Sequence, residues 1–366
     1  MKHNWEYKNL GEVCEIKTGK LDANAKVENG LYPFFTCDAK PYRIDTFAFD
    51  TEAILISGNG SNVGHVHYYN GKFNAYQRTY VLSNIRHFNP HYLVAFLKGF
   101  LRPYIYNKKK GGCIPFITLP MLTNFPIPVP PMDMQERIVG ELDKINEVMK
   151  DCRELLRNLD SLAQSLFYTY FGDPITNPKA WEVKTIQSIT KTTAGGTPAK
   201  SHPEYYINGK IPWLRSGEVC KMNIEDTELR ITELGMQNSS AKLVPINSVV
   251  IAMYGATAAQ VGIIRKDMTL NQAICAILPN NFTSPIYLYF CLSSLKNSLL
   301  KVAHGAAQPN ISQAIIKTTQ IPVPPHPLQE KFAKDIEAIE AVKATTSQQL
   351  AELQTLLDSR MDYWFN

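Results

Sequence analysis

The most regular pattern of apolar positions begins at Ile138 and advances by alternating steps of four and three residues. It passes through Leu142, Ile145, Met149, Cys152, Leu156, Leu159, Ala163, Leu166 and Tyr170. The same steps 194 residues later pass through Phe332, Ile336, Ile339, Lys343, Thr346, Leu350, Leu353, Leu357, Arg360 and Trp364, of which seven are apolar. An apolar repeat every 3.5 residues over about five heptads predicts two long helices that pair as a coiled coil.

The alternative is a pair of amphipathic helices, each packed only on its own domain. A helix of about 40 residues is about 60 Å long, whereas a domain of about 130 residues has a radius of gyration of about 14 Å. Such a helix extends beyond its own domain, which favours pairing. We expect the polar positions Lys343 and Thr346 to set the register of the pair.

A proline-rich phrase precedes each helix, at Ile127-Pro128-Val129-Pro130-Pro131 and at Ile321-Pro322-Val323-Pro324-Pro325. Proline fixes φ, and it pushes the preceding residue out of the α region, so each phrase is expected to be extended. Asp133 is predicted to cap the first helix, with Glu136 reaching back to it. Pro327 suits the first turn of the second helix.

The segments between these marks form two similar globular bodies. Each opens on Trp-Glu-x-Lys, at 5–8 and 181–184, and a Gly-Asp-Pro sequence at 172–174 ends the first helix. Strands are predicted at 53–57, 78–82, 248–252 and 273–277, and helices at 90–106 and 285–302. The fold class is therefore α+β, with an internal repeat. The domains are 1–131, the first helix 132–171, 172–325, and the second helix 326–366.

Charge follows the same division. The four segments carry net charges of +6, −3, +5 and −3, so basic bodies alternate with acidic helices. Basic bodies suit a polyanion, and acidic helices suit a protein partner or each other. No apolar run reaches the ~18 residues of a membrane span, so we expect a soluble, cytoplasmic protein. The seven cysteines never stand at C-x-x-C spacing, so we interpret them as reduced core thiols and not as disulfides or zinc ligands.

No constellation in the sequence favours catalysis. Gly195-Gly196-Thr197-Pro198 lacks the lysine of a phosphate loop and is better explained as a turn. His65-Val66-His67 has no third metal ligand near it in sequence. Asp173 with Glu182 and Lys184 resembles a nuclease pattern, but the Glu-x-Lys part recurs near the N-terminus without an acidic partner. The protein is therefore predicted not to be an enzyme and to hold no metal.

Candidate binding residues lie in loops at matching places of the two bodies. Amides and guanidinium groups can pair with base edges, and lysines can pair with phosphates. In the first body the candidates are Lys17, Asn59, Ser61, Asn62, Tyr76, Gln77, Arg78, Lys108, Lys109 and Lys110. In the second they are Lys191, Arg215, Ser216, Tyr254, Thr257, Asn271 and Gln272. An ordinary solvated turn is the alternative for each of them taken singly.

Taken together, these features resemble the specificity subunit of type I restriction–modification systems. The marks are the doubled Ile-Pro-x-Pro-Pro-x-x-x-Gln-Glu at 127–136 and 321–330, the stretch Phe171-Gly172-Asp173-Pro174-Ile175-Thr176-Asn177-Pro178-Lys179-Ala180-Trp181-Glu182, and Ile211-Pro212-Trp213-Leu214-Arg215-Ser216-Gly217-Glu218. The resemblance covers essentially the whole chain. The first body has Tyr32-Pro33-Phe34-Phe35-Thr36 in place of the Ile-Pro-Trp-Leu stretch.

The resemblance implies two target-recognition domains, each reading one half of a split double-stranded DNA site, related by a pseudo-two-fold. It implies that two antiparallel spacer helices set the spacing and dock the methyltransferase subunits, of which we expect two, and that a restriction subunit joins them. S-adenosylmethionine, ATP and magnesium are expected only in those partners. Because the two bodies differ in subtype, we expect unequal half-sites. A helical scaffold that docks proteins without reading DNA is the alternative, and a self-contained nuclease or methyltransferase is a third.

Overall fold

The computed structural model describes residues 5–107, 116–303 and 310–365. The chain forms two compact units: unit 1 contains Met1–Arg153 and Gln348–Asn366, and unit 2 contains Glu154–Ser347. Each unit thus takes one body together with a part of both long helices. In the described residues no helix is long and apolar enough to cross a membrane.

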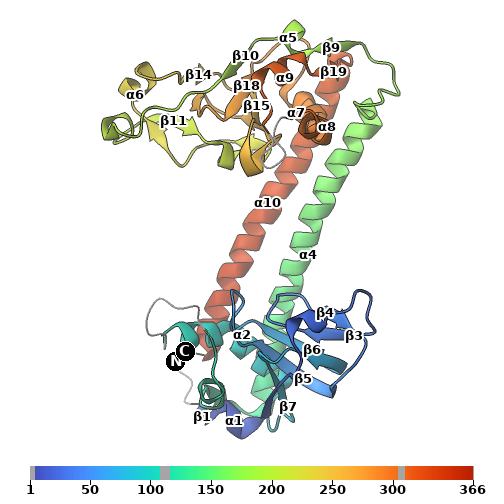
Figure 1. The fold of residues 1–366 in the computed structure, drawn as a ribbon, viewed down its shortest axis with the longest axis vertical. Coiled ribbons are helices and arrows are strands. Elements are labelled where there is room, and N and C mark those ends of the chain that lie inside the picture. Colours follow the sequence, from blue (N-terminus) through green and yellow to red (C-terminus); the bar gives the residue numbers. More distant parts are fainter. Residues whose placement is uncertain (1–4, 108–115, 304–309, 366) are drawn as a thin grey trace. The chain divides into compact units, whose positions relative to one another are not determined.

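Unit 1 contains a six-stranded sheet in the order β2-β7-β5-β6-β3-β4 and a separate pair, β1-β8 (Figure 1). Its strands are β1 (Glu6–Asn9), β2 (Glu15–Thr18), β3 (Tyr32–Phe35), β4 (Tyr42–Ile44), β5 (Phe49–Ser57), β6 (Val66–Ala75), β7 (Thr79–Ser83) and β8 (Pro126–Val129). Its helices are α1 (Leu10–Val13), α2 (Pro90–Asn107) and α3 (Leu119–Thr123), followed by the first part of α4 (Met132–Phe171).

Unit 2 repeats this order, but its main sheet is divided into β10-β18-β15-β16-β12 and β13-β11-β17-β14, beside the pair β19-β9. Its strands are β9 (Val183–Thr185), β10 (Thr192–Ala194), β11 (Ile211–Leu214), β12 (Asn223–Ile224), β13 (Arg230–Ile231), β14 (Leu243–Val244), β15 (Val249–Ala252), β16 (Val261–Ile264), β17 (Met268–Leu270), β18 (Ile274–Ile277) and β19 (Gln320–Pro322). Its helices are α5 (Ile186–Ile189), α6 (Glu233–Gln237), α7 (Pro285–Ser294), α8 (Lys296–Lys301), α9 (Gln313–Thr318) and the first part of α10 (His326–Phe365).

The predicted α+β class and the four predicted strands are confirmed, since β5, β7, β15 and β18 cover them within a residue or two. The predicted helix at 90–106 is α2. The prediction of a single helix at 285–302 is wrong in one respect, because the structure has two helices there, α7 and α8, separated at Leu295. The backbone N–H of Leu295 bonds to the oxygens of Cys291 and Ser293, which closes α7 before α8 begins.

The two long helices run through Met132–Phe171 and His326–Phe365. Each of the twenty positions of the 3.5-residue pattern is buried or partly buried. The two polar positions near the middle of the pattern, Lys343 and Thr346, have hydrogen-bond partners. Lys343 Nζ lies 2.7 Å from both Asp160 Oδ1 and Glu340 Oε1, and the Thr346 hydroxyl donates to the oxygen of Val342. Burial opposes the charge of Lys343, but these hydrogen bonds raise its pKa above the ordinary value.

Each long helix also belongs to the core of a globular body. In unit 1, Ile138 of α4 and Trp364 of α10 share a buried cluster with Leu93 of α2 and Ile54 of β5. In unit 2, Phe167, Phe332 and Ile336 share a cluster with residues of α7, β15 and β18. Pairing and packing on a body, which we weighed as alternatives, therefore occur together. Within each unit the N-terminal part of one long helix lies with the C-terminal part of the other, as antiparallel helices do.

In each unit the Trp-Glu-x-Lys segment and the proline-rich segment pair with each other as short strands. Antiparallel β1 and β8 align Glu6 with Val129, and β9 and β19 align Val183 with Pro322. The proline phrases are thus extended, as expected. The tryptophans that open these strands have a matching role, because Trp181 Nε1 donates to the oxygen of Phe171 at 2.9 Å and Trp5 Nε1 donates to that of Trp364 at 3.4 Å. Each tryptophan therefore satisfies a carbonyl at the C-terminus of a long helix.

A buried glutamine joins the start of each long helix to its body. Gln135 accepts from the backbone N–H of Asn89 at 2.8 Å and donates to the oxygens of His87 and Pro130. In unit 2, Gln329 accepts from the N–H of Ser284 at 2.8 Å and donates to the oxygens of Phe282 and Pro324, at 2.9 and 2.8 Å. We call this set of bonds the glutamine joint.

A buried tyrosine reinforces the glutamine joint from the body's helix. Tyr92 of α2 donates to the oxygen of Pro128 at 3.0 Å, and Tyr287 of α7 donates to that of Pro322 at 2.6 Å. The predicted cap at Asp133 is wrong, because α4 begins at Met132 and Asp133 lies inside its first turn. The oxygen of Pro131 already accepts from the N–H groups of Met134 and Gln135. Pro327 does lie in the first turn of α10.

We predict that Gln329→Ala destabilises the protein by about 2–4 kcal/mol, because it leaves buried backbone groups without partners. Gln348→Ala is the matched control. Gln348 is exposed on the same helix and bonds only to Glu352 among the described residues, so its loss should cost no more than about 0.5 kcal/mol. Urea unfolding followed by circular dichroism checks both. Equal midpoints for the two variants would contradict the role given to the joint.

Candidate nucleic-acid interface

Three segments of unit 1 meet at one end of its sheet and are tied together by backbone hydrogen bonds. The N–H of Tyr76 donates to the oxygen of Phe35 at 2.9 Å, which joins the end of β3 to the turn before β7. The N–H of Gly58 donates to the oxygen of Arg78, and that of Ile117 donates to the oxygen of Gly58, both at 2.8 Å. The segments that follow β3 and β5 and the segment that precedes β7 are therefore held side by side, and Ile117 joins the segment before α3 to them.

Unit 2 has the same three bonds. The N–H of Asn271 donates to the oxygen of Leu214, that of Met253 to Ala273, and that of Ile311 to Met253, each at 2.8 Å. Phe35 thus corresponds to Leu214, Gly58 to Met253, and Arg78 to Ala273. We call these two matching sets of bonds the recognition framework.

The framework of unit 1 carries four of the ten residues predicted as binding candidates in this body. Asn59 Oδ1 accepts from the thiol of Cys37 at 3.0 Å. Gln77 and Arg78 are exposed and line a cavity of about 280 Å³ together with Gly58, Tyr80 and Ile117. The structure thus brings Asn59, Tyr76, Gln77 and Arg78 together, as grouped from the sequence.

In unit 2 the matching positions are occupied by side chains of different types. Tyr254 takes the place of Asn59, and its hydroxyl donates to the oxygen of Gln272 at 2.6 Å. Burial raises the pKa of Tyr254, so it remains a hydroxyl donor at neutral pH. Asn271 Oδ1 accepts from the N–H of Ala273, so this amide closes a turn, while the side chain of Gln272 is exposed. Thr257 is partly buried in the one-turn helix after Tyr254.

Arg215 has a structural engagement that the sequence does not reveal. Its Nε lies 3.3 Å from Glu218, and its Nη2 pairs with Glu228. Its backbone N–H also donates to Glu218 Oε2 at 3.0 Å, at the start of a short helix that contains Ser216. Because two carboxylates already hold the guanidinium, Arg215 is a weaker candidate for contact with a phosphate or a base than predicted.

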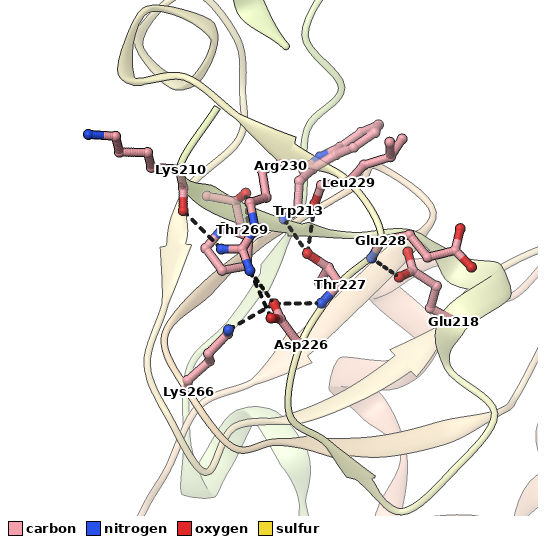
Figure 2. Close-up of polar contacts among 11 residues, drawn as sticks. Lys210, Trp213, Glu218, Asp226, Thr227, Glu228, Leu229, Arg230, Lys266 and Thr269 are labelled. Atoms are coloured by element: carbon pink, nitrogen blue, oxygen red, sulfur yellow. Dashed lines mark hydrogen bonds and ion pairs between the residues drawn. The ribbon is translucent and has the colours of Figure 1, made fainter. Parts of the chain in front are cut away.

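The loop beside Arg215 is acidic and tightly bonded. Figure 2 shows Asp226 accepting from Arg230 and Lys266, with Glu218 receiving the N–H of Glu228 at 2.8 Å. Hydrogen bonds from Lys266 and from the backbone of Thr227, with the charge of Arg230, hold the pKa of Asp226 below its usual value. The carboxylates here are paired with Arg215, Arg230 and Lys266, so these basic side chains are engaged within the protein.

The remaining predicted residues have mixed surroundings. Lys17 is exposed on β2 and pairs with Glu15 at 3.0 Å, and Lys191 is exposed just before β10. Ser61 is exposed and Asn62 partly buried in the loop after β5. Lys108, Lys109 and Lys110 lie outside the described residues.

The sequence placed Tyr32-Pro33-Phe34-Phe35 where the second body has Ile-Pro-Trp-Leu, but it did not show that the two stretches have matching neighbouring strands. Tyr32-Pro33-Phe34-Phe35 and Ile211-Pro212-Trp213-Leu214 form corresponding strands, β3 and β11. Each pairs with one antiparallel and one parallel neighbour: Phe34 aligns in parallel with Asn74, and Trp213 with Thr269. The two bodies therefore share this strand although its side chains differ. The signal in the sequence was the proline at its second position in both copies.

The weaker candidates for chemistry have structural roles. A Cβ on Gly195 would lie 2.2 Å from the oxygen of Leu270, so the Gly-Gly sequence permits close approach of two backbones. The rings of His65 and His67 lie 4.5 Å apart, and the described residues contain no cluster of three or more metal ligands. Burial and the charge of nearby Lys98 lower the pKa of both histidines. Asp173 Oδ1 accepts from the N–H of Ile175 in a turn.

The cysteines are only partly the core thiols that we expected. The six in the described ranges are free. Cys14, Cys275 and Cys291 are buried, and desolvation raises the pKa of each thiol to about 12. Cys37 and Cys152 are partly buried, and Cys220 is exposed.

The duplicated framework and the paired helices define a protein made of two copies of one domain. The family model described as the type I restriction modification DNA specificity domain matches residues 2–155 and 178–355. The chain belongs to this family.

Individual relatives agree with the family. The specificity subunit of the type I restriction enzyme EcoDI from Escherichia coli is 36% identical over 159 residues, which are 43% of this chain and 35% of that protein. The EcoR124I/EcoR124II specificity subunit, also from Escherichia coli, is 28% identical over 65% of this chain and 61% of that protein. The chain thus spans less than two-thirds of the length of these relatives. The crystal structure of a type I restriction–modification S subunit from M. genitalium has the same fold, with a TM-score of 0.64 at 17% identity, and covers 100% of this chain and 97% of that one.

The two arginines should behave differently when removed. We predict that Arg78→Ala weakens binding of the assembled complex to its DNA site by about tenfold or more, as expected for a group that contacts a base or phosphate directly. Arg215→Ala should change affinity by less than about threefold and should mainly loosen the loop at 225–230. Fluorescence anisotropy with a labelled duplex measures affinity, and limited proteolysis measures the loop. A larger loss of affinity for Arg215→Ala than for Arg78→Ala would contradict these assignments.

Proposed function

We propose that this chain is the DNA-reading subunit of a type I restriction–modification complex. Each body is a target-recognition domain that reads one half of a bipartite double-stranded DNA site. The observation that carries the proposal is the recognition framework, in which the same three backbone bonds hold different side chains in the two units. Two recognition domains that share one backbone framework but carry different side chains suit a DNA site whose two halves differ in sequence.

The long helices are proposed to set the spacing between the half-sites and to dock the methyltransferase subunits. Each unit has a groove between its body and both helices. In unit 2 the groove has a volume of about 880 Å³ and includes Tyr289, Glu340 and Lys343. In unit 1 its volume is about 450 Å³ and it includes Val94 and Asn146, the counterparts of Tyr289 and Glu340. A groove that occurs twice supports two methyltransferase subunits, beside which restriction subunits would assemble.

We infer that the chain itself does no chemistry. Its framework residues are amides, hydroxyls and a guanidinium, which bind by hydrogen bonding. S-adenosylmethionine, ATP and magnesium would belong to the partner subunits, and the complex would act on cytoplasmic DNA. The competing function, a scaffold that docks proteins without reading DNA, accounts for the grooves but not for exposed Gln77 and Arg78 at one end of the sheet.

Selection from a random duplex pool tests this function. The chain assembled with its methyltransferase subunits should enrich two short motifs separated by a fixed unread gap. The chain without those subunits should transfer no methyl group to adenine. If no split motif is enriched, the scaffold function is favoured. If the purified chain alone transfers methyl groups, a self-contained enzyme is favoured.

The spacing role has a separate test. Seven residues inserted after Met149 and seven after the α10 residue that lies opposite should lengthen the unread gap by about 3 base pairs, since a heptad adds about 10 Å of helix and a base pair about 3.4 Å of DNA. A heptad keeps the seam in register only when both helices receive it, so a single insertion should prevent assembly. Sequencing of the selected duplexes measures the gap. An unchanged gap in the doubly lengthened protein would contradict the role of the helices.

A further inference from the structure

The thiol of Cys37 lies where the three segments of the unit 1 framework meet. Its Sγ donates to Asn59 Oδ1 at 3.0 Å and lies 3.5 Å from the backbone oxygen of Arg78. Cys37 stands two residues after Phe35, whose oxygen anchors the framework. One side chain from the first segment thus touches both of the others.

The contact determines which end of the Asn59 amide is free. A thiol has one proton to donate, and the nearer acceptor is the amide oxygen of Asn59. With its oxygen engaged by Cys37, the amide keeps its two Nδ2 donors available, and within the described ranges they have no hydrogen-bond partner. Donors match the acceptor atoms N7 and O6 that guanine presents in the major groove. A freely rotating asparagine would present either end.

The segment around Cys37 has little freedom to move away. The Thr79 hydroxyl donates to the oxygen of Phe35 at 3.2 Å, and the Thr36 hydroxyl accepts from the N–H of Asp38. The oxygen of Asp38 lies 3.3 Å from His67 Nε2. Hydrogen bonds to the residues before and after Cys37 therefore hold its thiol in place.

Unit 2 does not contain this pair. Ser216 takes the place of Cys37, and Tyr254 takes the place of Asn59 and bonds to Gln272 instead. An effect of Cys37 on base choice is therefore confined to one of the two domains. This confinement provides an internal control, because one half-site should respond and the other should not.

We propose that Cys37 is a positioning residue for base selection by the first recognition domain, acting by fixing the orientation of the Asn59 amide. The inference rests on the proposed function, since it assigns one determinant of what that domain reads. The thiol itself need not touch DNA.

The experiment is selection from a random duplex pool by the full complex, with discrimination measured at every position of both half-sites. Cys37→Ala and Cys37→Val both remove the donor, and each should lower discrimination at one base pair of one half-site by about tenfold. Cys37→Ser keeps a donor and should stay within about threefold of the unaltered chain. Asn59→Ala should affect the same base pair, and Cys37→Ala with Asn59→Ala should be no worse than Asn59→Ala alone.

Unchanged discrimination in Cys37→Ala and Cys37→Val would overturn the inference. So would a loss shared by both half-sites, a defect that Cys37→Ser fails to rescue, or additive effects in the double variant. If the unaltered chain selects a bipartite motif and only the Cys37 variants behave otherwise than expected, the proposed function stands and the inference fails. If the unaltered chain selects no such motif, both fail.

Discussion

The buried glutamine at the start of each long helix is the contact on which the rest of each unit depends. The Pro-Pro sequence before it has no backbone N–H groups. Its buried carbonyl groups still need hydrogen-bond donors, which must come from other residues. Gln135 and Gln329 supply these donors from the first helical turn, and with the amide oxygen each accepts from the backbone just before α2 or α7. A side chain with both a donor and an acceptor is required, and an apolar residue of the same size would leave both partners unsatisfied.

This joint relates the helix to the recognition framework through a short chain of contacts. The helix start is bonded to the segment before α2 or α7, that helix shares a core with the sheet, and the sheet carries the framework at one end. Since each step is buried or backbone-mediated, exposed side chains in the framework can differ without changing the support. Asn59 and Tyr254, or Arg78 and Ala273, occupy matching positions on the same backbone. Recognition domains with different target sequences need variable loops that are held on rigid elements.

Features set by local sequence could be predicted, and features set by long-range pairing could not. The 3.5-residue pattern located both helices, and β-rich runs located β5, β7, β15 and β18, because burial periodicity is a local property. The role of Trp5 and Trp181 depends on which helix ends beside them, and the parallel strand that pairs with β3 or with β11 comes from a distant part of the sequence. Arg215 became a weaker candidate for a related reason: its partner Glu228 is thirteen residues away and reaches it only after the loop has folded. Cys37 was grouped with core thiols because its polar neighbour Asn59 comes from another loop.

The most direct test of the account is to sequence methylated adenines in the genome that encodes this chain, with and without its gene. The account predicts methylation at one bipartite motif with two different halves and a constant unread gap, which disappears when the gene is deleted. A continuous motif, two identical halves, or methylation that persists without the gene would contradict the claim that two unequal domains on one pair of helices read a split site.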